Sequence, residues 1–403
     1  MYKYKFNKFN EVGDVAFDML KGKYPNFVYR NKSNSHEVPC FCFHEAVQEE
    51  LEPMFEFLRL NGYKTLSLAE FEDIVLGKAA NPGKCVYLTF DDGLRSIWET
   101  LFPLLEKYDF RATSFIIPGR INYRSQYLPN LKDVWENRAK AEDLQNGEAG
   151  QEPLCTWEEI QVMSNSGLID FDSHSLDHSL VFTDPDIVDF ISPAALADYH
   201  AFEFPRYRVS TDDVTEVTQL GAPLYRTSPR MSGVPRYKDS ETLRQACTDF
   251  VAGQGGESFF QQENWRDELR DFAAASGHYK PESAEFESDA QCAERVRFEI
   301  AEAKRLIEEH LEGKTSKHLC YPWGAGSDLS CRISKDLGYV MSYWSHPQDN
   351  KRKIVVNQNP YVLDRLGPDF FFLLPGQGRR TLAEILLRKA RRRLTAGSPF
   401  LTH

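Results

Sequence analysis

Residues 89–93 read Thr-Phe-Asp-Asp-Gly and complete a run, 84–90, whose apolar content is typical of a buried strand. The two aspartates therefore stand at the carboxyl end of that strand. A second polar motif, His-Ser-Leu-Asp-His at 174–178, follows another short strand-like run. One carboxylate and two imidazoles are a common ligand set for a catalytic divalent metal that keeps a position open for water. The other carboxylate can act as a base beside that water, so the two motifs together indicate a metal-dependent hydrolase.

Each motif also has an ordinary explanation when it is taken alone. Asp-Asp-Gly is good turn chemistry, and a lone His-x-x-x-His is more often two surface or hydrogen-bonded histidines. If His174 and His178 lie on one helical turn, which Ser173 could cap, they face the same way. Asp91 and Asp92 point to different sides as neighbours at a strand end, so one can bind a metal while the other faces the substrate. A cation would also relieve the repulsion between the two carboxylates.

Strands and helices alternate along most of the chain, which predicts a mostly parallel sheet. Polar motifs at the carboxyl ends of strands are typical of a β/α barrel, so we expect a distorted (β/α) barrel of about seven strands. Ser67, with Glu70 three positions later, predicts a helix N-terminus. The predicted strands are 38–43, 84–90, 112–118, 168–171, 318–321 and 339–344, and the predicted helices are 50–60, 66–76, 96–108, 294–311 and 333–337.

The alternation stops between residues 179 and 291, where Pro, Gly, Asp and Ser are frequent. Bare loops of that size are uncommon, so we expect 179–291 to be an ordered insertion or subdomain within a main domain at 38–378. An N-terminal extension occupies 1–37. Residues 379–403 combine many arginines with Leu and Ile at helical spacing, which predicts a basic amphipathic helix and tail. Such a helix suits either contact with an anionic membrane surface or packing on the barrel with its arginines in solvent.

The composition is that of an ordinary globular protein, with 41% hydrophobic and 27% charged residues. The formal net charge of -12 argues against a nucleic-acid-binding protein. None of the eight cysteines belongs to a Cys-x-x-Cys pair, which favours reduced, buried thiols over a zinc site or a disulfide framework. The N-terminal residues show no secretory signal pattern, and no apolar run reaches the length of a membrane span. We therefore expect a cytoplasmic location, with peripheral contact at the inner face of the membrane left open for the C-terminal helix.

A third element, Tyr-Pro-Trp-Gly at 321–324, follows the strand predicted at 318–321. Together the three elements resemble the polysaccharide deacetylase family, the NodB-homology carbohydrate esterases. Residues 89–93 match the Thr-Phe-Asp-Asp-Gly motif of that family in full, and residues 174–178 match its His-Ser/Thr-x-x-His motif. The resemblance runs from about Val38 to Leu366, without the 179–291 insertion, and implies a barrel of the NodB-homology type.

The resemblance also implies a role for each matching residue. Asp91 becomes the expected general base. The expected metal ligands are Asp92, His174 and His178. The backbone N–H of Trp323 becomes the expected donor to the oxyanion.

The third motif departs from the family pattern, because Cys320 stands where an arginine usually orients the base. A branch similar to the poly-N-acetylglucosamine deacetylases also lacks that arginine and takes its general-acid histidine from an early strand. The run Phe-Cys-Phe-His at 41–44 looks like that strand, which makes His44 the expected acid and His346 the alternative. Arg365 can replace the missing arginine as the partner of Asp91, although an ordinary surface salt bridge explains it equally well.

These features predict hydrolysis of an N-acetyl group on an amino-sugar glycan or glycan precursor. Zinc is the metal that the resemblance implies, and nickel, cobalt and iron suit the same nitrogen and oxygen ligands. Two alternatives remain at this point: a deacylase of a non-sugar amide, and a catalytically silent relative that binds glycans. The intact Asp-His-His set argues against a pure binding module.

Overall fold

The computed structural model describes residues 17–122, 128–145, 154–198, 204–208, 213–344, 351–385 and 387. Contacts divide the chain into two compact units. The larger unit contains Val15–Leu176, Ile300–Gly324 and Ser334–His403. The smaller unit contains Met1–Asp14, Asp177–Glu299 and Ala325–Ile333.

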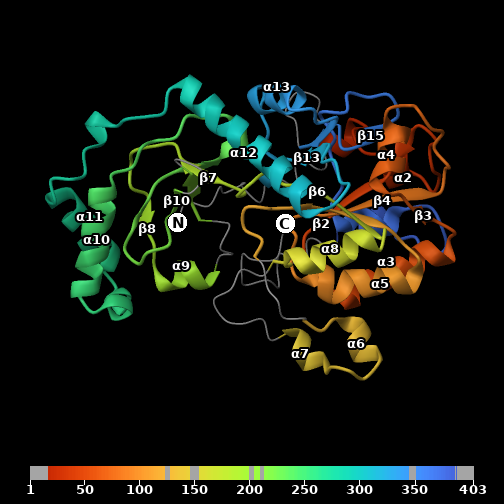
Figure 1. The fold of residues 1–403 in the computed structure, drawn as a ribbon, viewed down its shortest axis with the longest axis horizontal. Helices are drawn as coiled ribbons and strands as arrows, with labels where there is room; N and C mark the ends of the chain where they lie inside the picture. The colour runs from red at the N-terminus through yellow and green to blue at the C-terminus, as the bar shows by residue number, and fades with distance from the viewer. Residues whose placement is uncertain are drawn as a thin grey trace. The chain divides into compact units, whose positions relative to one another are not determined.

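A seven-stranded parallel sheet forms the centre of the larger unit (Figure 1). Its strand order is β14-β13-β6-β5-β4-β2, and the short β3 pairs with β4. The bounds are β2 Cys40–Phe43, β3 Lys64–Thr65, β4 Cys85–Phe90, β5 Ala112–Ile116, β6 Ile169–Ser173, β13 His318–Cys320 and β14 Met341–Tyr343. A separate antiparallel pair joins β1 Glu37–Val38 to β15 Ile354–Val355. The parallel sheet expected from the alternation of strands and helices is confirmed.

The segment at residues 363–366 closes this sheet into a distorted barrel. Leu363 bridges to β14 and Leu366 bridges to β2, both in the parallel sense. The N–H of Trp344 donates to the carbonyl of Leu363 at 3.0 Å, and the N–H of Cys42 donates to the carbonyl of Leu366 at 2.8 Å. Both edge strands thus pair with one short segment, so the distorted barrel expected from the sequence is confirmed.

Side chains alternate between the two faces of the strands, as the pleat requires. One set packs under the surrounding helices: Phe41, Phe43, Val86, Leu88, Phe90, Ile116 and Phe171. The other set fills the barrel interior: Cys40, Cys85, Tyr87, Phe115, Cys320, Met341 and Tyr343. Burial of each large side chain contributes about 1.5–3 kcal/mol. The inward series on β4 continues from Tyr87 to Thr89 and Asp91, which brings a carboxylate to the mouth of the barrel.

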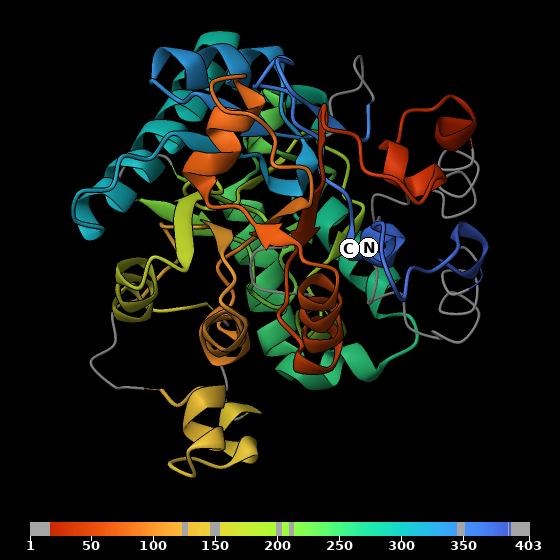
Figure 2. The same ribbon diagram turned by 90° about the vertical axis from the view of Figure 1, so that its right-hand side faces the viewer.

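Helices cover the outside of the barrel (Figure 1). Their bounds are α2 Asn26–Tyr29, α3 Gln48–Leu60, α4 Leu68–Val75, α5 Phe102–Tyr108 and α8 Trp157–Asn165. Further helices are α6 Leu131–Trp135, α7 Ala141–Gln145, α12 Asp289–His310 and α13 Asp328–Asp336, and the residues of α12 and α13 are divided between the two units. The pair α6 and α7 projects away from the sheet in both views (Figures 1 and 2). Helix α4 begins at the predicted capping box: the Oγ of Ser67 accepts from the N–H of Glu70 at 3.2 Å, and the carboxylate of Glu70 accepts from the N–H of Ser67 at 2.9 Å.

Two helices differ from the sequence prediction for local reasons. Helix α12 begins earlier than expected, because Ser288 and Gln291 form a reciprocal cap (3.2 and 2.9 Å) ahead of it. The helix expected at 96–108 starts as a π-helix, Ile97–Leu101, in which the N–H of Phe102 donates to the carbonyl of Ile97. Pro103 has no N–H to continue the ladder, and the regular helix α5 begins at Phe102 with Pro103 in its first turn.

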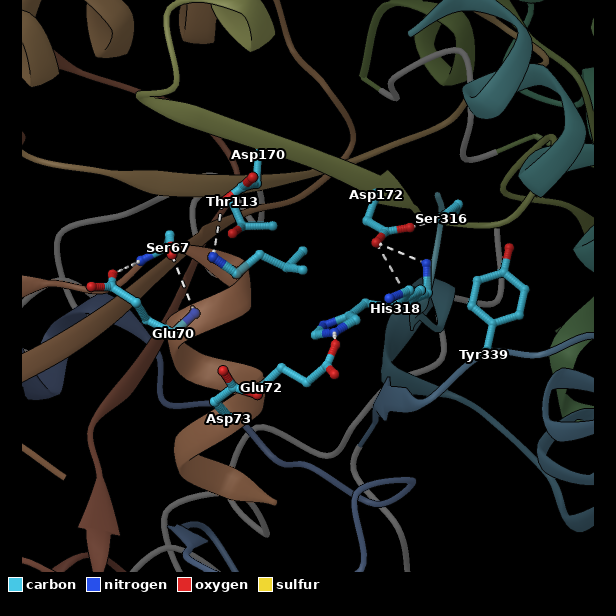
Figure 3. A network of polar contacts seen from close by, with 12 residues as sticks. Ser67, Glu70, Glu72, Asp73, Thr113, Asp170, Asp172, Ser316, His318 and Tyr339 are labelled. Carbon is cyan, nitrogen blue, oxygen red and sulfur yellow. Dashed lines mark hydrogen bonds and ion pairs between the residues drawn. The ribbon is translucent and has the colours of Figure 1, made fainter. Parts of the chain in front are cut away.

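A buried polar network ties β13 to β6 and to α4 (Figure 3). Asp172, which is fully buried on β6, accepts hydrogen bonds from the hydroxyl of Ser316 and from the N–H of His318, the latter at 3.1 Å. The His318 ring lies 3.0 Å from the hydroxyl of Tyr343 and 3.1 Å from a carboxylate oxygen of Glu72. The contact with His318 lowers the pKa of Glu72. The start of β13 is thereby held in place on both sides.

The smaller unit consists of short antiparallel pairs and helices. The paired strands are β7 Leu180–Phe182 with β12 Thr227–Pro229, β8 Asp189–Phe190 with β11 Pro223–Leu224, and β9 Arg206–Arg208 with β10 Val214–Glu216. The helices of this unit include α9 Pro193–Asp198, α10 Glu241–Gly253 and α11 Trp265–Ala275. The guanidinium of Arg230 is buried here against Glu287, at 2.7 Å. Charged pairs therefore occupy part of the interior of this unit.

The basic helix expected at 379–403 lies mostly outside the described residues, which end at 385 apart from 387. The first two arginines belong to the described part. Arg379 donates to the carbonyl of Phe27 at 3.0 Å, and the guanidinium of Arg380 lies 4.1 Å from the ring centre of Phe372. Among the described residues, no helix combines the length and apolar character needed to cross a bilayer.

Gly93 should resist substitution more strongly than Gly167. Its φ is +75°, and an added Cβ would lie 2.9 Å from the Cγ2 of Ile116. Gly167 has a φ of +70° with open space around it, so Gly167→Ala reports the backbone cost alone. We expect Gly167→Ala to cost about 1–2 kcal/mol and Gly93→Ala about 1–3 kcal/mol more, both measured by urea denaturation. Equal costs would show that the contact with Ile116 is relieved without strain.

Candidate active site

The polar residues singled out from the sequence follow the carboxyl ends of neighbouring parallel strands. Asp91 and Asp92 follow β4, His44 follows β2, and His174 follows β6. The carboxyl ends of parallel strands meet at one edge of a barrel, and this edge is where such folds carry their chemistry. The strand pairing β2-β4-β5-β6 brings these residues to one mouth of the barrel.

Asp91 forms a buried, two-pronged ion pair with Arg365. The two guanidinium nitrogens donate to the two carboxylate oxygens at 2.7 and 2.6 Å. The side chain of Asp91 is only 5% exposed and that of Arg365 only 10%. Arg365 also donates to the hydroxyl of Thr89 at 2.8 Å. Burial alone would raise the pKa of Asp91, but Arg365 and His174 hold it well below its usual range. Asp91 is therefore ionised across the physiological range of pH.

Arg365 reaches Asp91 from the segment that closes the barrel. The guanidinium lies 5.5 Å from the ring centre of Phe115 and 5.6 Å from that of Tyr343, inside the barrel. The sulfur of Cys320 lies 2.9 Å from a guanidinium nitrogen and 3.6 Å from the Asp91 carboxylate. A cysteine thus occupies the place of the arginine that begins the third motif elsewhere, while Arg365 supplies the positive charge from another part of the chain.

Asp92, His174 and His178 form a compact, buried group of possible ligands. One ligand atom of each residue lies within 4.8 Å of the others. The Nε2 of His174 lies 3.4 Å from an Asp92 oxygen, and its Nδ1 lies 2.9 Å from the carbonyl of Cys320. A carbonyl only accepts, so Nδ1 carries a hydrogen, and Nε2 is the ring nitrogen that faces Asp92. One carboxylate and two imidazoles at this spacing fit a divalent cation of the zinc class.

Several acidic groups lie close to the buried ring of His174. Burial favours the neutral ring, but Cys320, Asp91 and Asp92 together raise the pKa of His174 well above its ordinary value. Metal ligation requires the neutral imidazole, so a cation in this group and a proton on His174 compete for the same lone pair.

The turn from 174 to 178 is a loop, so His174 and His178 do not lie on one helical turn. Ser175 and His178 have φ values of +63° and +53°, in the left-handed region. Asp92 and Trp323 share this conformation, with φ values of +70° and +60°. Non-glycine residues rarely adopt it, and such strain gathers at functional sites. Side-chain spacing alone carries no information about these local backbone angles, so the sequence left the conformation of this turn open.

His44 lies beside Asp91 at the end of β2. The ligand atoms of His44, Cys42 and Asp91 lie within 4.8 Å of one another, and His44 is half-buried. His346, the alternative acid, lies outside the described residues. Trp323 is 38% exposed in a short turn, Pro322–Gly324, just after β13. His44 is thus within reach of the expected base, and the expected oxyanion donor lies beyond the end of a neighbouring strand.

The family model of polysaccharide deacetylase matches residues 78–194, which carry both the Asp-Asp-Gly and the His-x-x-x-His motifs. The chain contains a polysaccharide deacetylase domain. The match does not extend to His44, Trp323 or Arg365, whose placement rests on the structure.

Two curated relatives resemble part of this chain. The poly-beta-1,6-N-acetyl-D-glucosamine N-deacetylase of Escherichia coli (strain K12) is 26% identical over 125 residues, which are 31% of this chain and 17% of that protein. The protein of the same name from Staphylococcus aureus (strain N315) is 30% identical over 132 residues, which are 30% of this chain and 44% of that protein. The chain thus spans less than half the length of these relatives. Among solved structures, the BpsB deacetylase domain from Bordetella bronchiseptica covers 83% of this chain and 97% of its own, at 16% identity and a TM-score of 0.49.

Sequence analysis missed two features next to the deacetylase motifs. Asp177, inside the His-x-x-x-His motif, is fully buried and pairs with Arg208, whose Nη2 lies 2.9 Å away, and with Arg206 at 3.3 Å. This pairing fixes the residue that precedes His178. The alternating Arg-Tyr-Arg at 206–208 was a visible signal, but its partner was not. Cys42, which lies inside the run 41–44 and two residues before His44, is 3.5 Å from the Asp91 carboxylate.

Arg365→Met should destabilise the folded chain, because it leaves a buried carboxylate without its cation. We expect a loss of about 3–5 kcal/mol near neutral pH, measured by urea denaturation. Arg59→Met, which removes an exposed pair with Glu56, serves as the control and should cost under about 1 kcal/mol.

The loss should depend on pH in a defined direction. The folded-state pKa of Asp91 is depressed, so its ion pair contributes stability above the unfolded pKa of about 3.9 and loses it as the pH falls through the folded value. In Arg365→Met the unpaired carboxyl gains stability on protonation. The difference between the two proteins should therefore narrow as the pH falls from about 7 to about 4. A difference that stays constant over this range would contradict the ion pair as its source.

Proposed function

We propose that the deacetylase domain is a metal-dependent hydrolase that removes N-acetyl groups from an amino-sugar glycan. The observation that carries the proposal is the group of Asp92, His174 and His178, whose ligand atoms lie within 4.8 Å of one another immediately beside the ionised Asp91. Catalytic metal sites combine three protein ligands with a neighbouring base in this way. The names of the curated relatives support a β-1,6-linked N-acetylglucosamine polymer as the first substrate to test.

The chain supplies each proton transfer that amide hydrolysis needs. A divalent cation held by Asp92, His174 and His178 would supply Lewis-acid chemistry, which polarises an amide carbonyl and activates water. Asp91 accepts the proton of the attacking water, and Arg365 keeps that carboxylate ionised and oriented. His44 donates a proton to the leaving amine, and the backbone N–H of Trp323 donates to the oxyanion. Zinc suits the ligand set best, with nickel, cobalt and iron as further candidates.

Substitutions in the site should separate metal binding from turnover. Asp92→Ala and His178→Ala should lose stoichiometric metal, measured by elemental analysis after dialysis, because each removes one of three ligands. Asp91→Asn should keep the metal and lose turnover by roughly 100-fold or more, since an amide cannot take the proton. Asp73→Asn, which alters a half-exposed carboxylate of α4, is the matched control. Normal turnover in Asp91→Asn would remove Asp91 as the base.

Amine release should identify the substrate class. The panel contains β-1,6- and β-1,4-linked N-acetylglucosamine oligomers and an N-acetyl-lysine peptide, each with and without a chelator. We expect chelator-sensitive release from the sugar oligomers only. Release from the peptide alone would favour a deacylase of non-sugar amides. Stoichiometric metal with no release from any compound would contradict the proposal, and glycan binding without metal would indicate a silent relative.

A further inference from the structure

A second group of possible ligands combines Asp91 with two residues from the end of β2. Cys42 and His44 are two positions apart at the end of β2, so their side chains point to the same face. One ligand atom each of Cys42, His44 and Asp91 lies within 4.8 Å of the other two, and the Cys42 sulfur lies 3.5 Å from the Asp91 carboxylate. From this geometry we infer that Cys42, His44 and Asp91 form a second cation site, which takes a thiophilic divalent ion such as Cd²⁺ or Zn²⁺ in excess.

The donor atoms decide the class of ion. A thiolate sulfur and an imidazole nitrogen favour zinc-class and softer ions over Mg²⁺ and Ca²⁺, which prefer oxygen. The group offers three protein ligands and can complete a tetrahedral shell with water. Cys42 and His44 are both half-buried, so an ion from solution can reach them. All three residues belong to the larger unit.

A neighbouring group is the less suitable alternative. Asp91, His174 and Cys320 also bring three ligand atoms within 4.8 Å, but all three residues are buried. Asp91 contacts the guanidinium of Arg365 in both groups, but here the thiol does so as well, because the Cys320 sulfur lies 2.9 Å from a guanidinium nitrogen. Cys42 is therefore the thiol that a cation from solution should meet first.

The charge of the groups around Cys42 predicts that this site fills only when the metal is in excess. Asp91 and Arg365 together carry no net charge. A divalent ion that displaces the Cys42 proton to solvent adds one positive charge to a partly buried region, where Arg365 is already present. The Asp92–His174–His178 group contains no thiol, so it can bind a cation without releasing a thiol proton.

The functional consequence rests on the proposed function. The second ion takes a lone pair from His44, the proposed acid, and one from Asp91, the proposed base. Excess thiophilic metal should therefore inhibit amine release reversibly, while the first ion remains in place.

Spectroscopy tests the site without reference to activity. The full chain is titrated with Cd²⁺, and the near-ultraviolet charge-transfer band of a cadmium thiolate is recorded. We expect a band that saturates at about one equivalent per chain and is lost in Cys42→Ser. Cys331→Ser removes another half-buried thiol and should keep the band. A band that survives Cys42→Ser, or is lost instead in Cys320→Ser, overturns the assignment, as does the absence of any band.

A parallel titration of the Asp92→Ala/His178→Ala variant removes the first site. The Cd²⁺ band should persist there, and its loss would show that the thiol binds only as part of the first site. If that variant fails to fold, the difference between the full chain and Cys42→Ser decides the same question.

Inhibition separates this inference from the proposed function. In the amine-release assay, Cys42→Ser should raise the half-inhibitory Cd²⁺ concentration at least tenfold, relative to its own uninhibited rate. A Cys42-dependent band in a chain with no amine release would support the site and count against the proposed function. Chelator-sensitive release with unchanged Cd²⁺ inhibition in Cys42→Ser would support the function and overturn the site.

Discussion

The ion pair between Arg365 and Asp91 is the interaction on which the barrel mouth depends. Two charges are removed from water here, and such a pair is tolerated only when both partners are present with good geometry. Both guanidinium-to-carboxylate hydrogen bonds are short. Arg365 lies between Leu363 and Leu366, which pair with the two edge strands of the sheet. The same segment therefore closes the fold and sets the charge of the proposed base. Barrel closure and site chemistry are coupled through a single side chain.

The pair also explains how two adjacent carboxylates coexist in a buried place. Asp91 continues the inward series of β4 and meets Arg365. Asp92 adopts a left-handed backbone and turns instead toward His174. Each carboxylate thus has its own positive or hydrogen-bonding partner, so the repulsion expected between neighbours is met partly by the protein. A cation bound by Asp92 would therefore matter more for catalysis than for neutralising the two carboxylates.

Much of the fold follows from local features of the sequence. Apolar runs marked the strands, and the carboxyl ends of β4, β6 and β13 were located from the residues that follow them. The capping box at Ser67 is a property of four consecutive residues, so it could be predicted. Helix α12 begins ahead of the apolar stripe that predicted it. Ser288 and Gln291 form a capping box at its start, and both residues lie outside that stripe. The motif residues that follow β4 and β6 could also be identified, because each motif is contiguous in the sequence.

The sequence by itself determined which residue types follow each strand. The side-chain alternation of a strand and the position of its end both depend on consecutive residues. The tertiary structure alone decided which distant residues meet. Arg365 and Asp91 are 274 residues apart, and Arg208 and Asp177 are 31 residues apart across different elements. A charged residue looks the same in a sequence whether it faces solvent or a buried partner. Only barrel closure and strand order make Arg365 an interior cation, and they bring Cys42 and Cys320 to the same carboxylate.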